Sequence, residues 1–380
     1  MKTILIKPLL LMFTISFALC GAAKPQAPLN EFQRQVDAVF SPVFPADQPG
    51  AAVLIIKNGK MIFNRCYGIA DMDTRAKITP NTRFCIASVS KQFAAVAILQ
   101  LAEQGKLNLS DPLSKFFPEF KADFFKRITL HHILSHTSGI PDARPRDDRH
   151  FVLTATDVES CRYMETLDHL NFEPGCGNYE YINPTYQLIY QIVERVTGMD
   201  FEKYMKKYVF GKAGMKNTSY FQEGRDIPRM AHGYTPNPDG SYREYDYGEE
   251  TFFATKADGG IYTSVVDFAR WEKALHDNKV WNEASKRMAY TPQVAIPEGA
   301  NYGYQPYNSY GYGFFINERP GHHRIIYHTG DNGGFTIYAG KAPDDDVQVM
   351  FFSTRDNIDR MGIAAQVWNL LEQFHYVAIP

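Results

Sequence analysis

The sequence lacks a surplus of either charge and, beyond its first residues, any long apolar run. Lys plus Arg number 40 and Asp plus Glu number 42 in 380 residues, which gives a formal net charge of −2. This balance offers no general attraction for polyanions, so we expect neither nucleic acid nor an anionic membrane surface as a partner. No stretch of the mature chain reaches the roughly 18 apolar residues of a membrane span. With 44% hydrophobic residues, the chain should form one large or two moderate globular domains.

Cysteine is also scarce, with five in the chain. Four of them follow the N-terminal region: Cys66, Cys85, Cys161 and Cys176. In an oxidising compartment they can form two disulfides in any of three pairings, or they can remain buried thiols, and the sequence leaves both open. Their spacing is not that of a zinc site, and we expect no metal and no cofactor.

The N-terminus has the pattern of an export signal. MKTILIKPLLLMFTISFALCGAA contains two lysines, an apolar run at 9–19 and then small residues. This predicts a secretory signal peptide at residues 1–23 and a periplasmic or secreted protein. A lipid anchor on Cys20 is the less favoured alternative, because Leu19 stands where a small residue would be expected.

Hydrophobic periodicity predicts strands near both ends of the chain and helices in the middle. Helices are expected at 30–40, 88–104, 129–135, 155–167, 184–197, 201–210, 265–275 and 361–374, and strands at 51–57, 61–67, 313–316, 324–328, 335–339 and 347–353. Lys-Asn-Gly-Lys between the first two strands is a hairpin signal, and Ser264 can cap the helix that follows it. The predicted fold class is α+β. An antiparallel sheet is flanked by the N- and C-terminal helices (24–105 and 255–380) and carries a mostly helical insert (106–254).

A first candidate site lies in FCIASVSKQFAAVAILQLAEQG, residues 84–105, which joins a serine-rich turn to an apolar helix. Ser88 and Lys91 are three positions apart, on one helix face, so the hydroxyl and the amine can approach each other. A serine becomes a nucleophile when a base takes its proton, and burial lowers the pKa of a lysine toward that task. About one such spacing is expected by chance in a chain of this length, so alone it indicates only a core helix.

A second motif, Tyr181-Ile182-Asn183, precedes the helix predicted at 184–197. Alternate residues of an extended segment point the same way, so Tyr181 and Asn183 can face one site. A tyrosine near a lysine ammonium can be held partly as phenolate and act as a general base. Asn183 can orient the lysine and bind a substrate amide, although a tyrosine ahead of a helix is also often structural.

A third motif, His328-Thr329-Gly330, is predicted to end a strand before a glycine turn. Glycine at this position lets a ligand backbone approach closely. The N–H of Asp331 can then act with the N–H of Ser88 as an oxyanion hole. The alternative is an ordinary edge strand followed by a hairpin.

In this order the three motifs resemble those of the serine β-lactamase and penicillin-binding D-Ala-D-Ala carboxypeptidase superfamily, in its class C-like branch. The resemblance covers residues 51–353, including LHHILSHTSGIPD and DGGIYTSVVDFARW. It implies a β-lactamase/transpeptidase-like fold over residues 24–380 and hydrolysis through an acyl-enzyme. The resemblance also implies catalytic roles: Ser88 as nucleophile, Lys91 as its partner and Tyr181 as the base that also protonates the leaving group. It implies that the substrate is bound by Asn183, His328, Thr329 and Gly330. The N–H groups of Ser88 and Asp331 would form the oxyanion hole. Which of Lys91 and Tyr181 first takes the proton stays open, because they titrate as a coupled pair.

Two departures from the family pattern bear on the substrate. His328 replaces the usual lysine of class C β-lactamases, and a neutral histidine holds a carboxylate less well. Asp331 stands where a small or neutral residue is more common, and it should repel anionic substrates and favour amines. We therefore expect an exported serine hydrolase of D-amino-acid-containing peptides or amides. The alternatives are a β-lactamase or a carboxylesterase and, less favoured, a non-catalytic penicillin-binding sensor.

Two other patterns suggest different chemistry. His132 and His136 are four apart on an expected helix, as zinc ligands can be, but the Glu of the metalloprotease pattern is missing. Glu173 before Pro-Gly suggests the Glu that acts as deacylation base in class A β-lactamases. The Tyr-x-Asn motif downstream argues against this class A interpretation.

Overall fold

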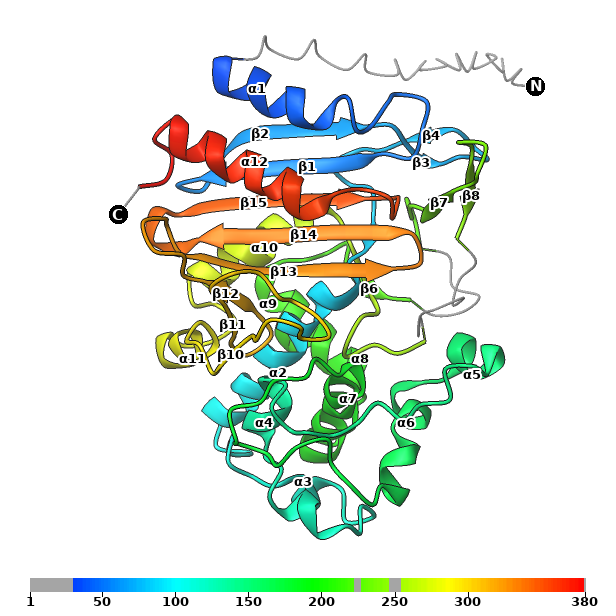
Figure 1. Ribbon diagram of the computed structural model, residues 1–380, viewed down its shortest axis with the longest axis vertical. Helices are drawn as coiled ribbons and strands as arrows, with labels where there is room; N and C mark the ends of the chain where they lie inside the picture. The colour runs from blue at the N-terminus through cyan, green and yellow to red at the C-terminus, as the bar shows by residue number, and fades with distance from the viewer. Residues whose placement is uncertain (1–29, 222–226, 246–253, 379–380) are drawn as a thin grey trace, which may run out of the picture.

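The computed structural model describes residues 30–221, 227–245 and 254–378. The predicted signal peptide and Cys20 lie outside this part of the chain. One antiparallel sheet runs through the upper half of the molecule (Figure 1). Its eight strands lie in the order β10 (Val294–Ala295), β11 (Asn308–Tyr310), β12 (Phe315–Asn317), β13 (Ile325–Asn332), β14 (Phe335–Ala342), β15 (Val347–Ser353), β1 (Ala51–Lys57) and β2 (Lys60–Tyr67).

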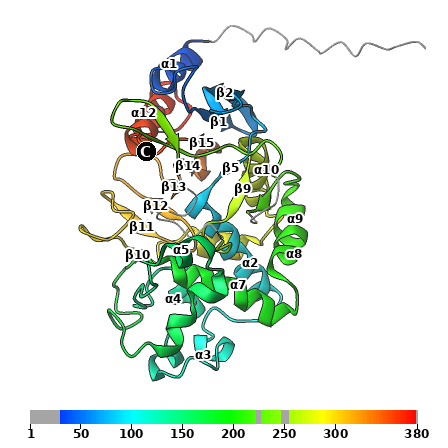
Figure 2. The same cartoon turned by 90° about the vertical axis from the view of Figure 1, so that its right-hand side faces the viewer.

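The sheet joins both ends of the chain, because β1 pairs with β15. The β1–β2 hairpin turns at Asn58 and Gly59, both with positive φ, as the Asn-Gly signal predicts. Helices α1 (Glu31–Phe40) and α12 (Arg360–Gln373) cover one face, and α10 (Val265–His276) packs on the other (Figure 2). Alternate residues of β1 therefore enter different cores: Val53 faces α1 and α12, whereas Leu54 joins the core on the side of α10. The α+β fold with its terminal flanking helices is confirmed.

The chain between the sheet strands is mainly helical and forms the lower half of Figure 1. It contains a 3-10 turn η1 (Ala87–Ser90), α2 (Lys91–Glu103), α3 (Leu113–Phe116), η2 (Asp123–Lys126), α4 (Leu130–Leu134), α5 (Arg149–Thr154), α6 (Asp157–Ser160), η3 (Arg162–Thr166), α7 (Asn183–Thr197), α8 (Phe201–Tyr204), the π-helix η4 (Met205–Phe210), α9 (Gly211–Ala213) and α11 (Glu283–Ala289). Short strands complete the structure: β3 (Ile69–Asp71), β4 (Ala76–Lys77), β5 (Phe84–Cys85), β6 (Ser219–Tyr220), β7 (Tyr234–Pro236), β8 (Tyr242–Glu244) and β9 (Ile261–Thr263).

Two local predictions differ from the structure. The helix expected at 155–167 is broken into α6 and η3, because Ser160 and Cys161 turn toward α7 and donate to Gln187 and to the Pro184 carbonyl. The strand expected at 324–328, with the His328-Thr329-Gly330 motif at its end, continues to Asn332, because β14 pairs with it from Ile326 to Asn332.

The β7–β8 hairpin lies in the predicted helical insert but bonds to the sheet part of the chain, where the Tyr234 N–H donates to the Thr354 carbonyl at 2.8 Å. The boundaries at 105 and 254 stay predictions.

The four cysteines in the described part of the chain are free thiols, which excludes the disulfide alternative here. The buried thiols of Cys85 and Cys161 instead point at backbone carbonyls of Gly259 and Pro184. Burial raises the pKa of the Cys85 thiol to about 12, so it is not a reactive thiolate.

Over the residues that the structure describes, no helix has the length and apolar character needed to cross a membrane.

Candidate active site

Ser88 lies on a tightly held turn at the head of α2. The helix itself begins at Lys91, and Ser88 belongs to the preceding η1. Its neighbour Ala87 has φ +45°, a strained value for a residue other than glycine. The turn is fixed to β9, because the Ile86 N–H donates to the Ile261 carbonyl at 2.9 Å. This anchoring holds the half-buried Ser88 hydroxyl at a defined corner of the fold.

Lys91 is fully buried, and its amine has three polar neighbours. Nζ lies 3.1 Å from Ser88 Oγ, 2.8 Å from Asn183 Oδ1 and 3.1 Å from the Asp258 carbonyl oxygen. Burial lowers the pKa of Lys91 to about 8; the negative charge of Asp258 opposes this shift and the positive charge of Arg144 adds to it. A substantial fraction of neutral amine is therefore present near neutral pH.

Tyr181 and Asn183 reach the same amine from the start of α7. Ile182 is extended and Asn183 begins the helix, with Pro184 behind it, so the two side chains project together as predicted. The Tyr181 ring centroid lies 4.9 Å from Lys91 Nζ. Burial raises the pKa of Tyr181 well above its usual value, and the nearby Ser88 hydroxyl opposes this without making a well-formed hydrogen bond. The resting site thus favours the neutral phenol, where the sequence suggested a partial phenolate.

The backbone of Tyr181 is held on both sides. Asn301 accepts from its N–H at 3.0 Å and donates to its carbonyl at 2.8 Å. The next N–H, on Ile182, donates to His136 Nδ1 at 3.2 Å, and the His136 ring lies 4.3 Å from that of Tyr181. His136 therefore supports the tyrosine segment.

This placement corrects the idea of a zinc-spaced pair. The helix α4 ends at Leu134, and His136 lies beyond it with φ +57°. His132 stays on α4, where its Nδ1 lies 3.1 Å from the Thr129 backbone nitrogen. Within the described ranges, no three His, Cys, Asp or Glu side chains are grouped as metal ligands would be.

The third motif lies within β13, alongside η1. Gly330 passes so close to the turn that a Cβ there would come within 2.4 Å of the Ile86 carbonyl oxygen. This contact places Asp331, the next residue, beside the segment that carries Ser88. His328 is fully buried: Nδ1–H donates to the Thr329 carbonyl at 2.7 Å, and Nε2 accepts from the Tyr310 hydroxyl at 3.1 Å. Burial lowers its pKa to about 3, with Lys91 adding to the effect, so His328 is neutral as expected.

Asp331 does not present a free negative charge. Arg360, at the start of α12, donates to its Oδ1 at 2.6 Å and to the Gly330 carbonyl at 3.2 Å. The Tyr302 hydroxyl donates to its Oδ2 at 3.0 Å and also lies 3.0 Å from Thr329 Oγ1. The positive charge of Arg360 therefore offsets the negative charge of Asp331, from which the sequence analysis expected repulsion of anions.

The structure thus brings the residues of the three motifs together, whereas Glu173 is exposed and paired with Arg127. Four further residues of the site lie outside the sequence motifs: Asp258, Asn301, Tyr302 and Arg360. Asp258 lies in a segment already noted, as the first residue of DGGIYTSVVDFARW. No sequence signal links Arg360 to Asp331, 29 positions earlier.

The matched family is the Beta-lactamase family, whose model covers residues 38–371. The chain belongs to the Beta-lactamase family. It is 30% identical to Protein flp of Staphylococcus aureus (strain NCTC 8325 / PS 47), over 81% of this chain and 60% of that protein, so it spans less than two thirds of that relative. A solved penicillin-binding protein from Bacillus halodurans matches with a TM-score of 0.74 and 25% identity, over 91% of this chain and 99% of that one.

A D-amino acid amidase from Ochrobactrum anthropi SV3, complexed with L-phenylalanine amide, shares the fold. Its TM-score is 0.72 at 21% identity, and the match covers 90% of this chain and 97% of that one. These matches confirm the resemblance to the serine β-lactamase and penicillin-binding superfamily.

The close approach of β13 to η1 predicts a selective effect of two glycine substitutions. Gly330→Ala should displace Ser88 from Asp331 and reduce acylation of Ser88 by about 10²-fold, the loss expected for a misplacement of about 1 Å. Gly259→Ala is the matched control, because its Cβ would meet Ala87 at an ordinary 3.8 Å. The measurement is the rate of labelling by a fluorophosphonate. Equal rates for the two variants would contradict the proposed contact.

Proposed function

We propose that the protein is an exported serine hydrolase that forms an acyl-enzyme on Ser88 and hydrolyses D-amino-acid-containing peptides or amides. The observation that carries this proposal is the buried Lys91 amine, 3.1 Å from Ser88 Oγ and with its pKa lowered to about 8. A buried base beside a hydroxyl at a strained turn is the arrangement that nucleophilic catalysis requires. Export to the periplasm or medium is proposed from the N-terminal sequence alone.

The hydrogen bonds around Lys91 fit the neutral amine as the first base. A neutral amine has two N–H groups and one lone pair. Asn183 Oδ1 and the Asp258 carbonyl can only accept, so they take the two N–H groups. The lone pair then faces Ser88, whose hydroxyl donates its proton as Oγ attacks the substrate carbonyl carbon.

The neutral phenol of Tyr181 suits a second step. Its ring borders Lys91, and its hydroxyl is buried without a hydrogen-bond partner. In our mechanism Tyr181 gives its proton to the leaving amine and recovers one from the Lys91 ammonium. The N–H groups of Ser88 and Asp331 bind the oxyanion, and water then releases the acyl group from Ser88 by the reverse proton transfers.

The substrate assignment rests on the charge at β13. His328 is neutral and buried, and Asp331 is paired with Arg360, so the strand offers no unpaired charge for a carboxylate. The fold also carries the D-amino acid amidase described above, which is a fold-level analogy. A class C-like β-lactamase or a carboxylesterase remains the alternative activity, and a penicillin-binding sensor without turnover is less favoured.

Covalent labelling tests the nucleophile. A fluorescent penicillin or a fluorophosphonate should label the protein, and Ser88→Ala should abolish labelling, because among the described residues Ser88 supplies the one hydroxyl that is hydrogen-bonded to Lys91 Nζ. Ser90→Ala is the matched control: its buried Oγ accepts from the Ile261 N–H, and labelling should persist. Labelling that survives in Ser88→Ala would refute the assignment.

The pH profile tests Lys91 as the base. Because the base must be unprotonated, kcat/KM for an uncharged p-nitrophenyl ester should rise about tenfold per pH unit and level off above about pH 8. His328, with a pKa of about 3, should add no limb between pH 5 and 9. An acid limb between pH 6 and 7 would count against Lys91.

The Arg360–Asp331 pair should set the preference for substrate charge. Asp331→Asn leaves Arg360 unpaired and should improve substrates with a carboxylate about three- to tenfold relative to D-amino-acid anilides, whereas Arg360→Gln should do the reverse. The panel contains nitrocefin, a D-alanyl-D-alanine peptide, a D-amino-acid anilide and a neutral ester as reference. The same change on every substrate in both variants would remove the pair from specificity.

A further inference from the structure

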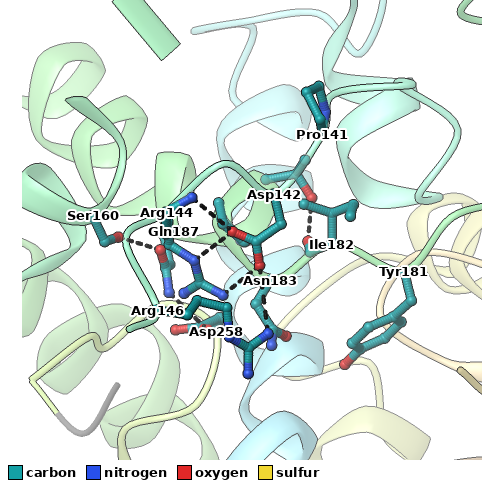
Figure 3. A network of polar contacts seen from close by, with 12 residues as sticks. Pro141, Asp142, Arg144, Arg146, Ser160, Tyr181, Ile182, Asn183, Gln187 and Asp258 are labelled. Carbon is teal, nitrogen blue, oxygen red and sulfur yellow. Dashed lines mark hydrogen bonds and ion pairs between the residues drawn. The ribbon is translucent and has the colours of Figure 1, made fainter. Parts of the chain in front are cut away.

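The segment before β9 that supplies the Asp258 carbonyl to Lys91 is clamped from both sides. Asp157, the first residue of α6, accepts from the backbone N–H groups of Lys256 at 2.8 Å and Ala257 at 3.0 Å. At the other side Gln187, on α7, donates to Asp258 Oδ2 at 3.0 Å. Ser160, the last residue of α6, donates to the same Gln187. Figure 3 shows Ser160, Gln187 and Asp258 following one another toward Asn183.

This clamp and the active site share α7. Asn183 begins the helix and binds Lys91 Nζ, and one turn later Gln187 holds the carboxylate of Asp258. The Asp258 carbonyl binds the same amine. A shift of Asp258 would therefore move one of the three partners of Lys91 without touching Ser88.

The side chains near Asp258 also carry charge. Its carboxylate is 6% exposed, and its Oδ1 has no hydrogen-bond partner among the described residues. Arg144 is 5% exposed and is held by Asp142, with Nη2 at 2.7 Å from Oδ2 (Figure 3). Both charges act on Lys91 through a desolvated region, where charge interactions are strong.

The other titratable groups around Lys91 are neutral. His136 and His328 have pKa values lowered by burial, and the Lys91 charge adds to both shifts. The rings of Tyr181 and Tyr186 face Nζ, and burial raises the pKa of both phenols. Asp157 lies further from Lys91, beside the backbone of Lys256 and Ala257. Burial and the charge of Asp258 raise the pKa of Asp157 to about 8, so it is largely protonated at neutral pH.

We propose that two buried charges set, in opposite directions, how readily Lys91 takes the proton from Ser88: the carboxylate of Asp258, whose backbone carbonyl also holds the Lys91 amine, and the guanidinium of Arg144. The proposal rests on the function proposed above in one respect, namely that Lys91 is the base. It adds that the network behind the lysine determines the pH range of the enzyme.

The test uses two substitutions with opposite expected effects. Asp258→Asn removes the charge that stabilises the ammonium, so the acid limb of kcat/KM should move down by about one pH unit. Arg144→Gln removes the opposing positive charge, so the limb should move up. A purely structural role would lower kcat/KM in both variants without moving the limb in opposite directions.

Two further variants provide controls. Arg146→Gln removes a guanidinium that also approaches Asp142, at 3.9 Å, but is 58% exposed, and the limb should stay in place. Arg144→Lys keeps the charge and should restore a limb near that of the wild type. It also keeps the test usable where Arg144→Gln, with Asp142 deprived of its buried guanidinium partner, fails to fold.

A direct titration separates this inference from the proposed function. With ¹³Cε-labelled lysine, the Lys91 resonance is identified by its absence in Lys91→Arg, and its pKa is read by NMR in the wild type, Asp258→Asn and Arg144→Gln. A resonance that shifts in the two predicted directions while the activity limb stays in place would support this inference and refute Lys91 as the base. A resonance that shifts in neither variant would overturn the inference, whatever the activity does.

Discussion

The burial of the Lys91 amine is the constraint on which the rest of the site depends. A buried amine without partners is costly, so the fold must bring polar groups to it. They come from three segments far apart in sequence: Ser88 in the turn before α2, Asn183 at the start of α7 and the carbonyl of Asp258 before β9. The helical and sheet parts of the chain thus meet around one nitrogen atom, and neither part alone contains the site.

The surroundings of this amine explain how it can work as a base. Tyr181, His136 and His328 are all buried, and burial favours the neutral form of each. With these rings neutral, the lysine they surround changes charge near pH 8. The same desolvation that destabilises its ammonium form makes it able to accept a proton from Ser88. Stability and reactivity are therefore opposed at this position, and the hydrogen bonds to Asn183 and Asp258 reduce the cost.

Much of the fold followed from local patterns. The strand at 347–353 and the cap at Ser264, which accepts from the Asp267 N–H, have the predicted positions, because periodicity and capping are properties of neighbouring residues. The three motifs of the candidate site could also be read from the sequence, through their order and spacing, and the roles of their residues stay predictions. The length of β13 could not be read from the sequence, because it depends on pairing with β14. The break at 160–161 was likewise hidden, because it arises from contacts with α7.

The interpretation of Asp331 shows the same limit in the site itself. From the sequence it is an unusual negative charge beside the nucleophile. In the structure Arg360 reaches it from a helix on the opposite side of the sheet, and Tyr302 ties it to Thr329. The two departures from the family pattern then act in one direction. A neutral histidine replaces a cation, and a paired carboxylate replaces a neutral residue. Strand β13 therefore carries no unpaired charge at these two positions.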